Sequence, residues 1–178
     1  MRVAILGNSG SGKSTLASLL ARETSAPTLD LDTVAWEPGQ IAVPRDPDVA
    51  ARELATFCDG HPDWIIEGCY ATLIGQSLRW RPTLLFLDPG VERCLAHCLA
   101  RPWEPHKYAS KEEQDQRLEP LLQWVREYPE RAGELGRAAH LACFDGYDGP
   151  KQRLEEVDTR RVQLLVADFR LQTPHQGR

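Results

Sequence analysis

A glycine-rich segment near the amino terminus is the strongest chemical feature of this sequence. It consists of Gly7, Asn8, Ser9, Gly10, Ser11, Gly12, Lys13 and Ser14. The segment matches the pattern G-x-x-x-x-G-K-[ST] without a gap, between an apolar run at 2–6 and a leucine spacing typical of a helix from Ser14 onward. Glycines allow backbone angles at which successive N–H groups meet phosphate oxygens at the positive end of the following helix. The pattern therefore predicts a site for nucleotide phosphates.

The motif also predicts roles for individual side chains. Lys13 would reach the β- and γ-phosphates of ATP, and Ser14 would supply a hydroxyl to Mg²⁺, a cation that takes oxygen ligands. Thr15 is a weaker candidate at the same nucleotide site. A glycine turn that only caps a helix is the alternative, which the unbroken match in this context disfavours. The motif leaves open whether the γ-phosphate is transferred to water, to a small molecule, or not at all.

Paired acids follow the next apolar run. Asp30 and Asp32 flank Leu31 at the end of a strand expected at 28–31, so strand alternation places both carboxylates on one side of the sheet's carboxyl edge. We predict that Asp30 holds water bound to Mg²⁺ and that Asp32 accepts the proton of an acceptor hydroxyl. Surface carboxylates or helix caps are the alternative.

Two further acids end later strands. Glu67 closes the run WIIEG and Asp88 closes TLLFLD, and either could orient magnesium. We rank Glu67 above Asp88, because Glu67 follows the strand expected beside the glycine loop, whereas Asp88-Pro89 is also typical of a helix cap.

These residues require an alternation of strands and helices. Near-continuous apolar runs predict buried strands at 2–6, 28–31, 64–66, 83–87 and 140–144. Helical patterns lie between and after them at about 48–58, 91–101, 112–127 and 150–157. This order predicts an α/β fold with a five-stranded parallel sheet and right-handed crossovers.

Length and composition limit the possible functions. A chain of 178 residues with 42% hydrophobic and 26% charged residues fits one globular domain. The net charge of −5 makes nucleic acid an unlikely partner. We expect no membrane contact, because neither a signal peptide nor an apolar run of about 20 residues is present. Five scattered cysteines fit reduced thiols and a cytoplasmic protein.

Several segments together resemble a known family. GNSGSGKST, LDLD, WIIEGCY, LLFLD, the arginines Arg93 and Arg101, QRL at 116–118 and FDGYDGPKQRLEEV are similar to the small P-loop kinases of the adenylate kinase and shikimate kinase type. Within these, LDTVAW and WIIEGCY resemble the subgroup called DNA topology modulation protein, or FlaR-like. The resemblance covers roughly residues 1–157.

The resemblance implies a three-layer P-loop NTPase fold over residues 1–157, with a substrate-binding flap at 33–60 and a lid at 102–116. Arg101 and Arg117 would stand at the edges of the lid and neutralise charge on the transferring phosphoryl group. Surface salt bridges are the alternative for these arginines. The family's base-binding loop would place adenine near Asp145 and Gly146. Residues 158–178 form a C-terminal extension that could be a sixth strand, a packed extension or a partner-binding segment.

Departures from the family limit the acceptor. The arginines with which adenylate kinases grip a nucleoside monophosphate are missing from LDLDTVAWEPG and EGCYA, and the triple glycine of shikimate kinases is replaced by Glu67-Gly68-Cys69. We therefore expect another small hydroxyl-bearing or phosphate-bearing metabolite. The side chains expected to contact it are Asp32, Trp36, Arg45, Tyr70 and Arg79.

The sequence as a whole favours an ATP- and Mg²⁺-dependent kinase, a monomer or homodimer, in which Lys13, Asp32, Arg101 and Arg117 carry the chemistry. Two alternatives stay open. One is a regulatory protein that uses ATP to order its flaps for a macromolecular partner. The other is a slow ATPase without an acceptor.

Overall fold

The computed structural model describes residues 1–37, 43–103 and 109–172. Its centre is a five-stranded, wholly parallel sheet in the order β2-β3-β1-β4-β5. The strands are β1 (Arg2–Gly7), β2 (Thr28–Asp30), β3 (Trp64–Gly68), β4 (Thr83–Leu87) and β5 (Lys151–Leu154). The predicted α/β fold with a five-stranded parallel sheet is confirmed.

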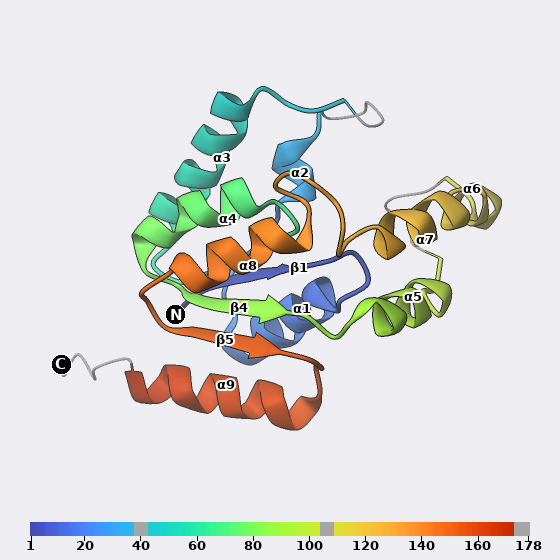
Figure 1. Cartoon of the computed structure of the whole chain (residues 1–178). Helices are drawn as coiled ribbons and strands as arrows, with labels where there is room; N and C mark the ends of the chain where they lie inside the picture. Colours follow the sequence, from blue (N-terminus) through green and yellow to red (C-terminus); the bar gives the residue numbers. More distant parts are fainter. Residues whose placement is uncertain (38–42, 104–108, 173–178) are drawn as a thin grey trace.

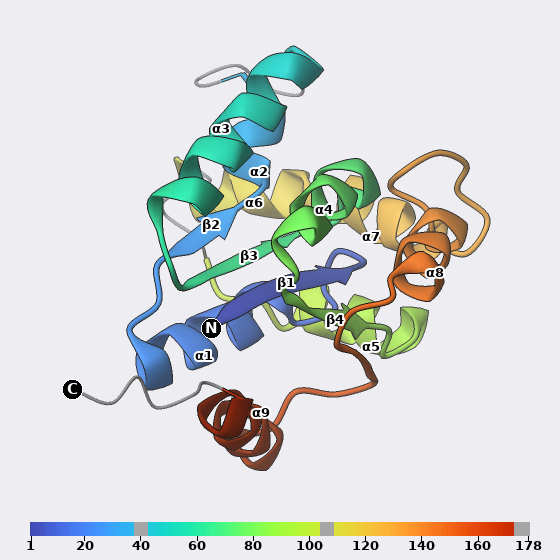
Figure 2. The ribbon, with the colours of Figure 1, turned by 90° about the vertical axis from the view of Figure 1, so that its left-hand side faces the viewer.

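Helices cover both faces of this sheet (Figures 1 and 2). One face carries α1 (Lys13–Thr24) and α9 (Thr159–Gln172), and the other carries α3 (Pro47–Gly60), α4 (Ala71–Ser77) and α8 (Arg137–Gly146). Beyond the carboxyl ends of the strands lie α5 (Val91–Leu99), α6 (Lys111–Gln116) and α7 (Leu118–Arg126). The short elements are α2 (Asp32–Ala35) and the 3₁₀ turn η1 (Leu78–Trp80).

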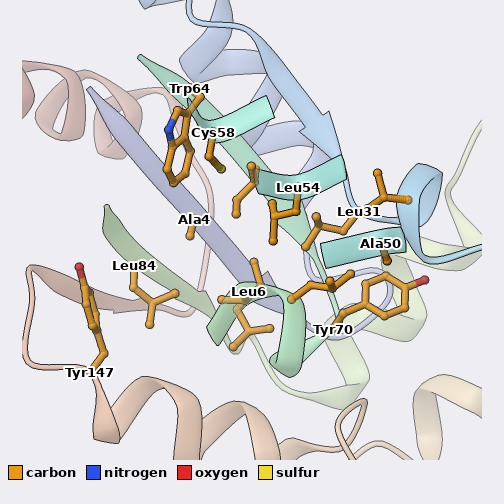
Figure 3. Packing of buried hydrophobic residues seen from close by; sticks show 14 of the residues in the cluster. Ala4, Leu6, Leu31, Ala50, Leu54, Cys58, Trp64, Tyr70, Leu84 and Tyr147 are labelled. Atoms are coloured by element: carbon orange, nitrogen blue, oxygen red, sulfur yellow. The ribbon is translucent and has the colours of Figure 1, made fainter. Parts of the chain in front are cut away.

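Alternation along β1 divides the core in two. Val3 and Ile5 belong to the cluster under α1 and α9, whereas Ala4 and Leu6 belong to the cluster under α3, α4 and α8, shown in Figure 3. All four side chains are fully buried. A central strand buried on both faces reads as a continuous apolar run, which is why the sequence identified β1.

The last predicted strand is wrong. Residues 140–144 lie within α8, and the fifth strand is β5 at 151–154, where the sequence predicted a helix over 150–157. A short apolar run fits a buried helix turn as well as a strand. Only Leu154 is buried in β5, because this strand lies at the edge of the sheet. Its sequence, KQRL, therefore lacks the apolar run of a central strand.

The remaining helical predictions differ from the structure mainly at their ends. The predicted helix at 48–58 is α3, and the one at 91–101 is α5, which ends at Leu99. The helix expected over 112–127 is divided into α6 and α7, with Arg117 between them.

The C-terminal helix α9 packs on the body of the protein. Its residues Val162, Leu165, Val166 and Phe169 share a buried cluster with side chains of β1 and α1. Of the three alternatives left open for this tail, the described part through residue 172 is thus a packed helix. No helix in the described ranges combines the length and the apolar character needed to cross a bilayer.

Candidate active site

The glycine loop joins β1 to α1 and needs its glycines for steric reasons. Gly10 and Gly12 have φ angles of 75° and 97°, a region that other residues rarely adopt. A Cβ atom on Gly10 would lie 2.4 Å from the carbonyl oxygen of Cys94 in α5, and one on Gly7 would lie 2.5 Å from that of Leu87. The loop is therefore packed against the end of β4 and against α5, and it has no room for a side chain at Gly7 or Gly10.

Hydrogen bonds hold the loop in its curled form. Lys13 Nζ donates to the carbonyl oxygen of Asn8 over 2.9 Å, so the lysine side chain folds back across the loop. The amide of Asn8 donates to the carbonyl oxygen of Val125, and its Oδ1 accepts from the N–H of Ser9 over 2.8 Å. His97 Nδ1 lies 2.8 Å from the carbonyl oxygen of Gly10. These contacts keep the loop preorganised between β1, α5 and α7.

A cavity of about 170 Å³ opens over the loop at the carboxyl edge of the sheet. Its lining comes from the loop, from the ends of β2 and β3, and from the end of α5. The residues are Ser9, Gly10, Gly12, Lys13, Ser14, Asp30, Asp32, Glu67, Gly68, Cys69, His97 and Arg101. We call it the phosphate cavity. It brings five of the predicted motif residues, the paired aspartates, Glu67 and Arg101 together in one place, whereas Gly7, Asn8 and Ser11 of the motif do not line it.

Glu67 reaches this cavity because of its register. Ile65 faces α1, so Glu67, two residues later in β3, lies on the same face beside the first turn of that helix. Ser14 Oγ donates to Glu67 Oε1 over 2.5 Å. Burial raises the pKa of Glu67, and the nearby carboxylates of Asp30 and Asp32 add to this, while Lys13 and the Ser14 hydrogen bond act against it. Glu67 is thus a buried carboxylate whose charge is incompletely compensated.

The paired aspartates reach the cavity by a different route from the one predicted. Strand β2 ends at Asp30, and Asp32 is the first residue of helix α2, so strand alternation does not apply to Asp32. Asp30 Oδ1 accepts the N–H of Asp32 over 2.9 Å, and the carbonyl of Asp30 accepts the hydroxyl of Thr33. Asp30 therefore accepts hydrogen bonds from the first two residues of α2, one position before the N-cap residue Leu31, and also lines the cavity with Asp32.

Two of the residues predicted to contact the acceptor, Tyr70 and Trp36, are hydrogen-bonded to Asp32 directly or through each other and do not line the phosphate cavity. Tyr70 Oη donates to Asp32 Oδ1 over 2.7 Å, and Trp36 Nε1 donates to Tyr70 Oη over 2.6 Å. Burial and the Asp32 carboxylate raise the pKa of Tyr70 above its ordinary value, so the phenol keeps its proton at neutral pH. Asp32, Tyr70 and Trp36 form a continuous hydrogen-bonded chain.

The predicted arginines fall into two groups. Arg101 lines the phosphate cavity, whereas Arg117 lies outside it and pairs with Glu113 at 3.4 Å. Arg45 pairs with Glu53 and lines a neighbouring cavity with Trp36 and Tyr70. Arg79 stacks 3.8 Å above the ring of Trp80, away from the other acceptor contacts. The catalytic role of Arg117 and the acceptor role of Arg79 stay predictions.

The residues expected near adenine are not brought to the glycine loop. Asp145 and Gly146 end α8, and the Lys151 ammonium at the start of β5 binds the carbonyl oxygens of Phe144 and Asp145 there. Because β5 begins beside Leu84, near the start of β4, this corner lies at the amino edge of the sheet, opposite the phosphate cavity. The placement of adenine near these two residues was implied by the family resemblance alone, and neither of them lines the phosphate cavity.

Other residues complete the picture of the site. Thr15 is exposed and does not line the phosphate cavity, and the hydroxyl of Ser11 is buried without a partner among the described residues. Gly68, Cys69 and His97 line the cavity, although the sequence analysis did not assign them to it. For Gly68 and Cys69 the available signal was their position directly after Glu67. His97 had none, because its contact to the loop depends on how α5 packs.

The donor set of the cavity fits magnesium. A serine hydroxyl and the carboxylates of Glu67 and Asp30 are the oxygen ligands that Mg²⁺ takes, together with phosphate oxygens and water. In the described ranges, no group of three or more His, Cys, Asp or Glu side chains could hold a metal ion on its own.

Comparisons with solved structures agree with this architecture. The chain is 18% identical to a sugar kinase from a Janibacter species, with a TM-score of 0.55 and coverage of 97% of this chain and 95% of that one. It is 16% identical to shikimate kinase from Bacteroides thetaiotaomicron, with a TM-score of 0.55 and coverage of 96% and 97%. For shikimate kinase from Aquifex aeolicus the values are 18%, 0.51, 96% and 96%.

No family model and no curated protein matches the chain. At such identities the structural likeness concerns the fold. The chain has the P-loop NTPase fold seen in shikimate kinases.

Proposed function

We propose that this protein is a kinase that transfers the γ-phosphoryl group of ATP, with Mg²⁺, to a hydroxyl group of a small molecule. The observation that carries the proposal is the set of residues that line the phosphate cavity. A phosphate-binding loop with Lys13, the Ser14–Glu67 pair, Arg101 and the carboxylate of Asp32 all line it. A site built only to bind a nucleotide has no need of a carboxylate such as Asp32 beyond the metal ligands.

Each group has a task in such a transfer. The loop N–H groups and Lys13 would hold the β- and γ-phosphates. Ser14, with Glu67 and Asp30 through water, would hold Mg²⁺, whose positive charge would balance the negative charge of the phosphates. Arg101 would balance charge on the transferring phosphoryl oxygens.

Asp32 would receive the acceptor's proton. The acceptor oxygen forms a bond to the γ-phosphorus, and the bond from that phosphorus to the bridging oxygen breaks, leaving its electron pair on ADP. The acceptor proton passes to Asp32 and then to water. ATP and an alcohol thus give ADP, a phosphate monoester and one proton.

The wider features of the chain fit this proposal. We infer that 33–60 acts as the substrate flap and 102–116 as the lid of a domain spanning 1–157, so that closure excludes water. Parts of both segments, 38–42 and 104–108, lie outside the described residues. The likeness of LDTVAW and WIIEGCY to the DNA topology modulation protein subgroup supports kinship with that subgroup. The five cysteines are not joined in disulfides, which suits a cytoplasmic enzyme.

The test is ADP release in the presence of Mg²⁺, ATP and a pooled set of small alcohols and phosphorylated metabolites. The proposal expects release to rise strongly with some acceptor, and Asp32→Asn to reduce that release about a hundredfold or more while ATP binds with nearly unchanged affinity. The surface variant Asp168→Asn, which changes an exposed carboxylate in α9, is the matched control. A rate of ADP release that no acceptor increases would favour a slow ATPase and overturn the proposal.

A further inference from the structure

A second cavity is linked to the phosphate cavity through the hydrogen-bonded chain of Asp32, Tyr70 and Trp36. It has a volume of about 260 Å³ and lies between α2, α3 and α4, and we call it the side cavity. Its lining residues are Ala35, Trp36, Pro44, Arg45, Pro47, Ala50, Tyr70, Thr72, Leu73, Gln76, Glu134 and Leu135. The Tyr70 hydroxyl donates to Asp32, which lines the phosphate cavity, and accepts from Trp36, which lines the side cavity. A molecule in the side cavity would therefore contact Tyr70, which is hydrogen-bonded to the predicted proton acceptor Asp32.

The lining of the side cavity is mostly apolar, and its two charged side chains, Arg45 and Glu134, already have partners. Arg45, whose side chain is 7% exposed, is paired with Glu53. Glu134 Oε2 accepts the N–H of Thr72 at the start of α4, where a carboxylate is stabilised by the helix terminus. An anionic ligand would meet Glu134 and would find no cation in this lining whose charge is unbalanced. Burying an anion there would be strongly unfavourable.

Tyr70 orients the Asp32 carboxylate through a hydrogen bond. Among the described residues it is the one side chain that donates to this carboxylate, and it does so at Oδ1, so Oδ2 is available to the acceptor. Tyr70 is 6% exposed, and its proton is held by burial and by the Asp32 charge. Because the Trp36 indole donates to the same phenol oxygen, the phenol has one direction left for its own proton, which is toward Asp32.

We propose that the side cavity binds the acceptor, that this acceptor is a small neutral alcohol with an apolar ring-sized body, and that Tyr70 is a positioning residue that orients Asp32. The proposal rests on the function proposed above and names its substrate class. The volume is below the range of about 300–1,000 Å³ common for ligand pockets, which limits the body to about one ring with short substituents. The ring lies against Trp36 and Leu73, and its hydroxyl points toward Asp32.

The chemical step is unchanged by this assignment. The alcohol oxygen attacks the γ-phosphorus, ADP leaves with the electron pair of the broken bond, and the alcohol proton moves to Asp32 Oδ2. A neutral acceptor also enters the site without adding to the charge that Asp30, Asp32 and Glu67 already place there.

Binding can be measured without catalysis, through the indole N–H signal of Trp36 in ¹H–¹⁵N NMR spectra of the full chain, assigned with Trp36→Phe. The probes are benzyl alcohol and 4-(hydroxymethyl)benzoate, which share a ring and a hydroxyl and differ by a carboxylate. We expect benzyl alcohol to shift the Trp36 signal and the carboxylate analogue to bind at least about tenfold more weakly. The indole of Trp64, buried under α3, should not respond to either. Equal or tighter binding of the carboxylate analogue overturns the substrate class.

The positioning role has its own readout. In Tyr70→Phe, which removes only the hydroxyl, we expect kcat with a ring-bearing alcohol to fall about tenfold or more, while KM for ATP stays within about twofold. Leu73→Ala, which enlarges the side cavity, should instead raise KM for the alcohol. If Tyr70→Phe leaves kcat unchanged, the positioning role is overturned. If benzyl alcohol shifts Trp36 but no alcohol raises ADP release, the kinase function fails while the ligand class of the cavity stands.

Discussion

Two acids flank the central strand of this protein, and their surroundings differ. Strand β1 pairs with β3 on one side and with β4 on the other. Glu67 is the penultimate residue of β3, and Asp88 directly follows β4. Both carboxylates are almost completely buried. Asp88 accepts hydrogen bonds from Arg137 and Arg153, whereas Glu67 accepts one from the neutral hydroxyl of Ser14.

We propose that this difference separates a structural acid, Asp88, from a functional one, Glu67. The two arginines that balance Asp88 tie α8 and β5 to the end of β4. Glu67 has Lys13 nearby, but burial outweighs it and the pKa of Glu67 is raised. A buried acid left short of positive charge is what a site awaiting a cation requires. We infer that Glu67 acts in the reaction and lowers the stability of the fold, and that Asp88 stabilises the fold.

The largest expected effect is on activity at Glu67. In Glu67→Gln we expect Mg²⁺-dependent turnover to fall by about a hundredfold to a thousandfold, because a group that orients the cation loses its charge. Steady-state ADP release at saturating ATP measures this. Glu119→Gln, which changes an exposed glutamate paired with Arg126 in α7, is the matched control and should keep nearly full activity. Wild-type turnover in Glu67→Gln would remove Glu67 from the site.

Asp88 should show the opposite behaviour. Asp88→Asn leaves two arginines beside a neutral side chain, and we expect a loss of about 2 kcal/mol in the free energy of unfolding. The value is below that of a fully buried pair because the arginine side chains are 34% and 45% exposed. Urea unfolding measures the loss, and turnover per folded molecule should change less than about threefold. A stable but inactive Asp88→Asn would reverse the assignment of the two acids.

A smaller effect is expected on the pH dependence of the melting temperature in Glu67→Gln. An acid whose pKa is raised in the folded state does not destabilise the fold well below its ordinary pKa of 4.5. The destabilisation grows as the pH rises above 4.5 and is complete above the raised pKa. Glu67→Gln should therefore melt at a higher temperature than wild type at pH 7, by about 2–4 °C for each kcal/mol recovered, and the gain should vanish near pH 4. Thermal unfolding of both proteins across this range, without Mg²⁺, checks it. A gain that grows as the pH falls would contradict the burial argument.

The smallest effects belong to the single arginines around Asp88. In Arg137→Gln or Arg153→Gln the other arginine still balances the carboxylate, so each should lower the free energy of unfolding by less than about 1 kcal/mol. Urea unfolding of the two variants and of the double variant measures this. The double variant should lose more than the sum of the single losses. Simple additivity would mean that the arginines do not share Asp88 as a common partner.

The sequence predicted the parts of this site that depend on local pattern. The glycine loop, Glu67 and the strands β1, β3 and β4 follow from an unbroken motif and from continuous apolar runs. Asp32 was predicted at the site, although by strand alternation, whereas the structure brings it there as the first residue of α2. Local pattern thus located the residue but gave the wrong geometry.

The parts that were missed depend on tertiary packing. Strand β5 carries three polar residues because it is an edge strand, and its Arg153 pairs with an acid 65 positions earlier in the chain. Nothing in KQRL indicates this pairing, so the balance of charge at Asp88 could not be read from the sequence. The contact of His97 with Gly10 spans 87 positions and depends on the packing of α5 against the loop.

The central claim is that the loop from Gly7 to Ser14 binds a triphosphate, and titration calorimetry with Mg·ATP tests it most directly. We predict saturable binding at one site, weakened at least about tenfold in Lys13→Ala. Arg22→Ala removes one positive charge from the other end of the same helix and should bind as wild type does. Absence of binding heat in the wild-type protein, or equal affinity in Lys13→Ala, would contradict the account.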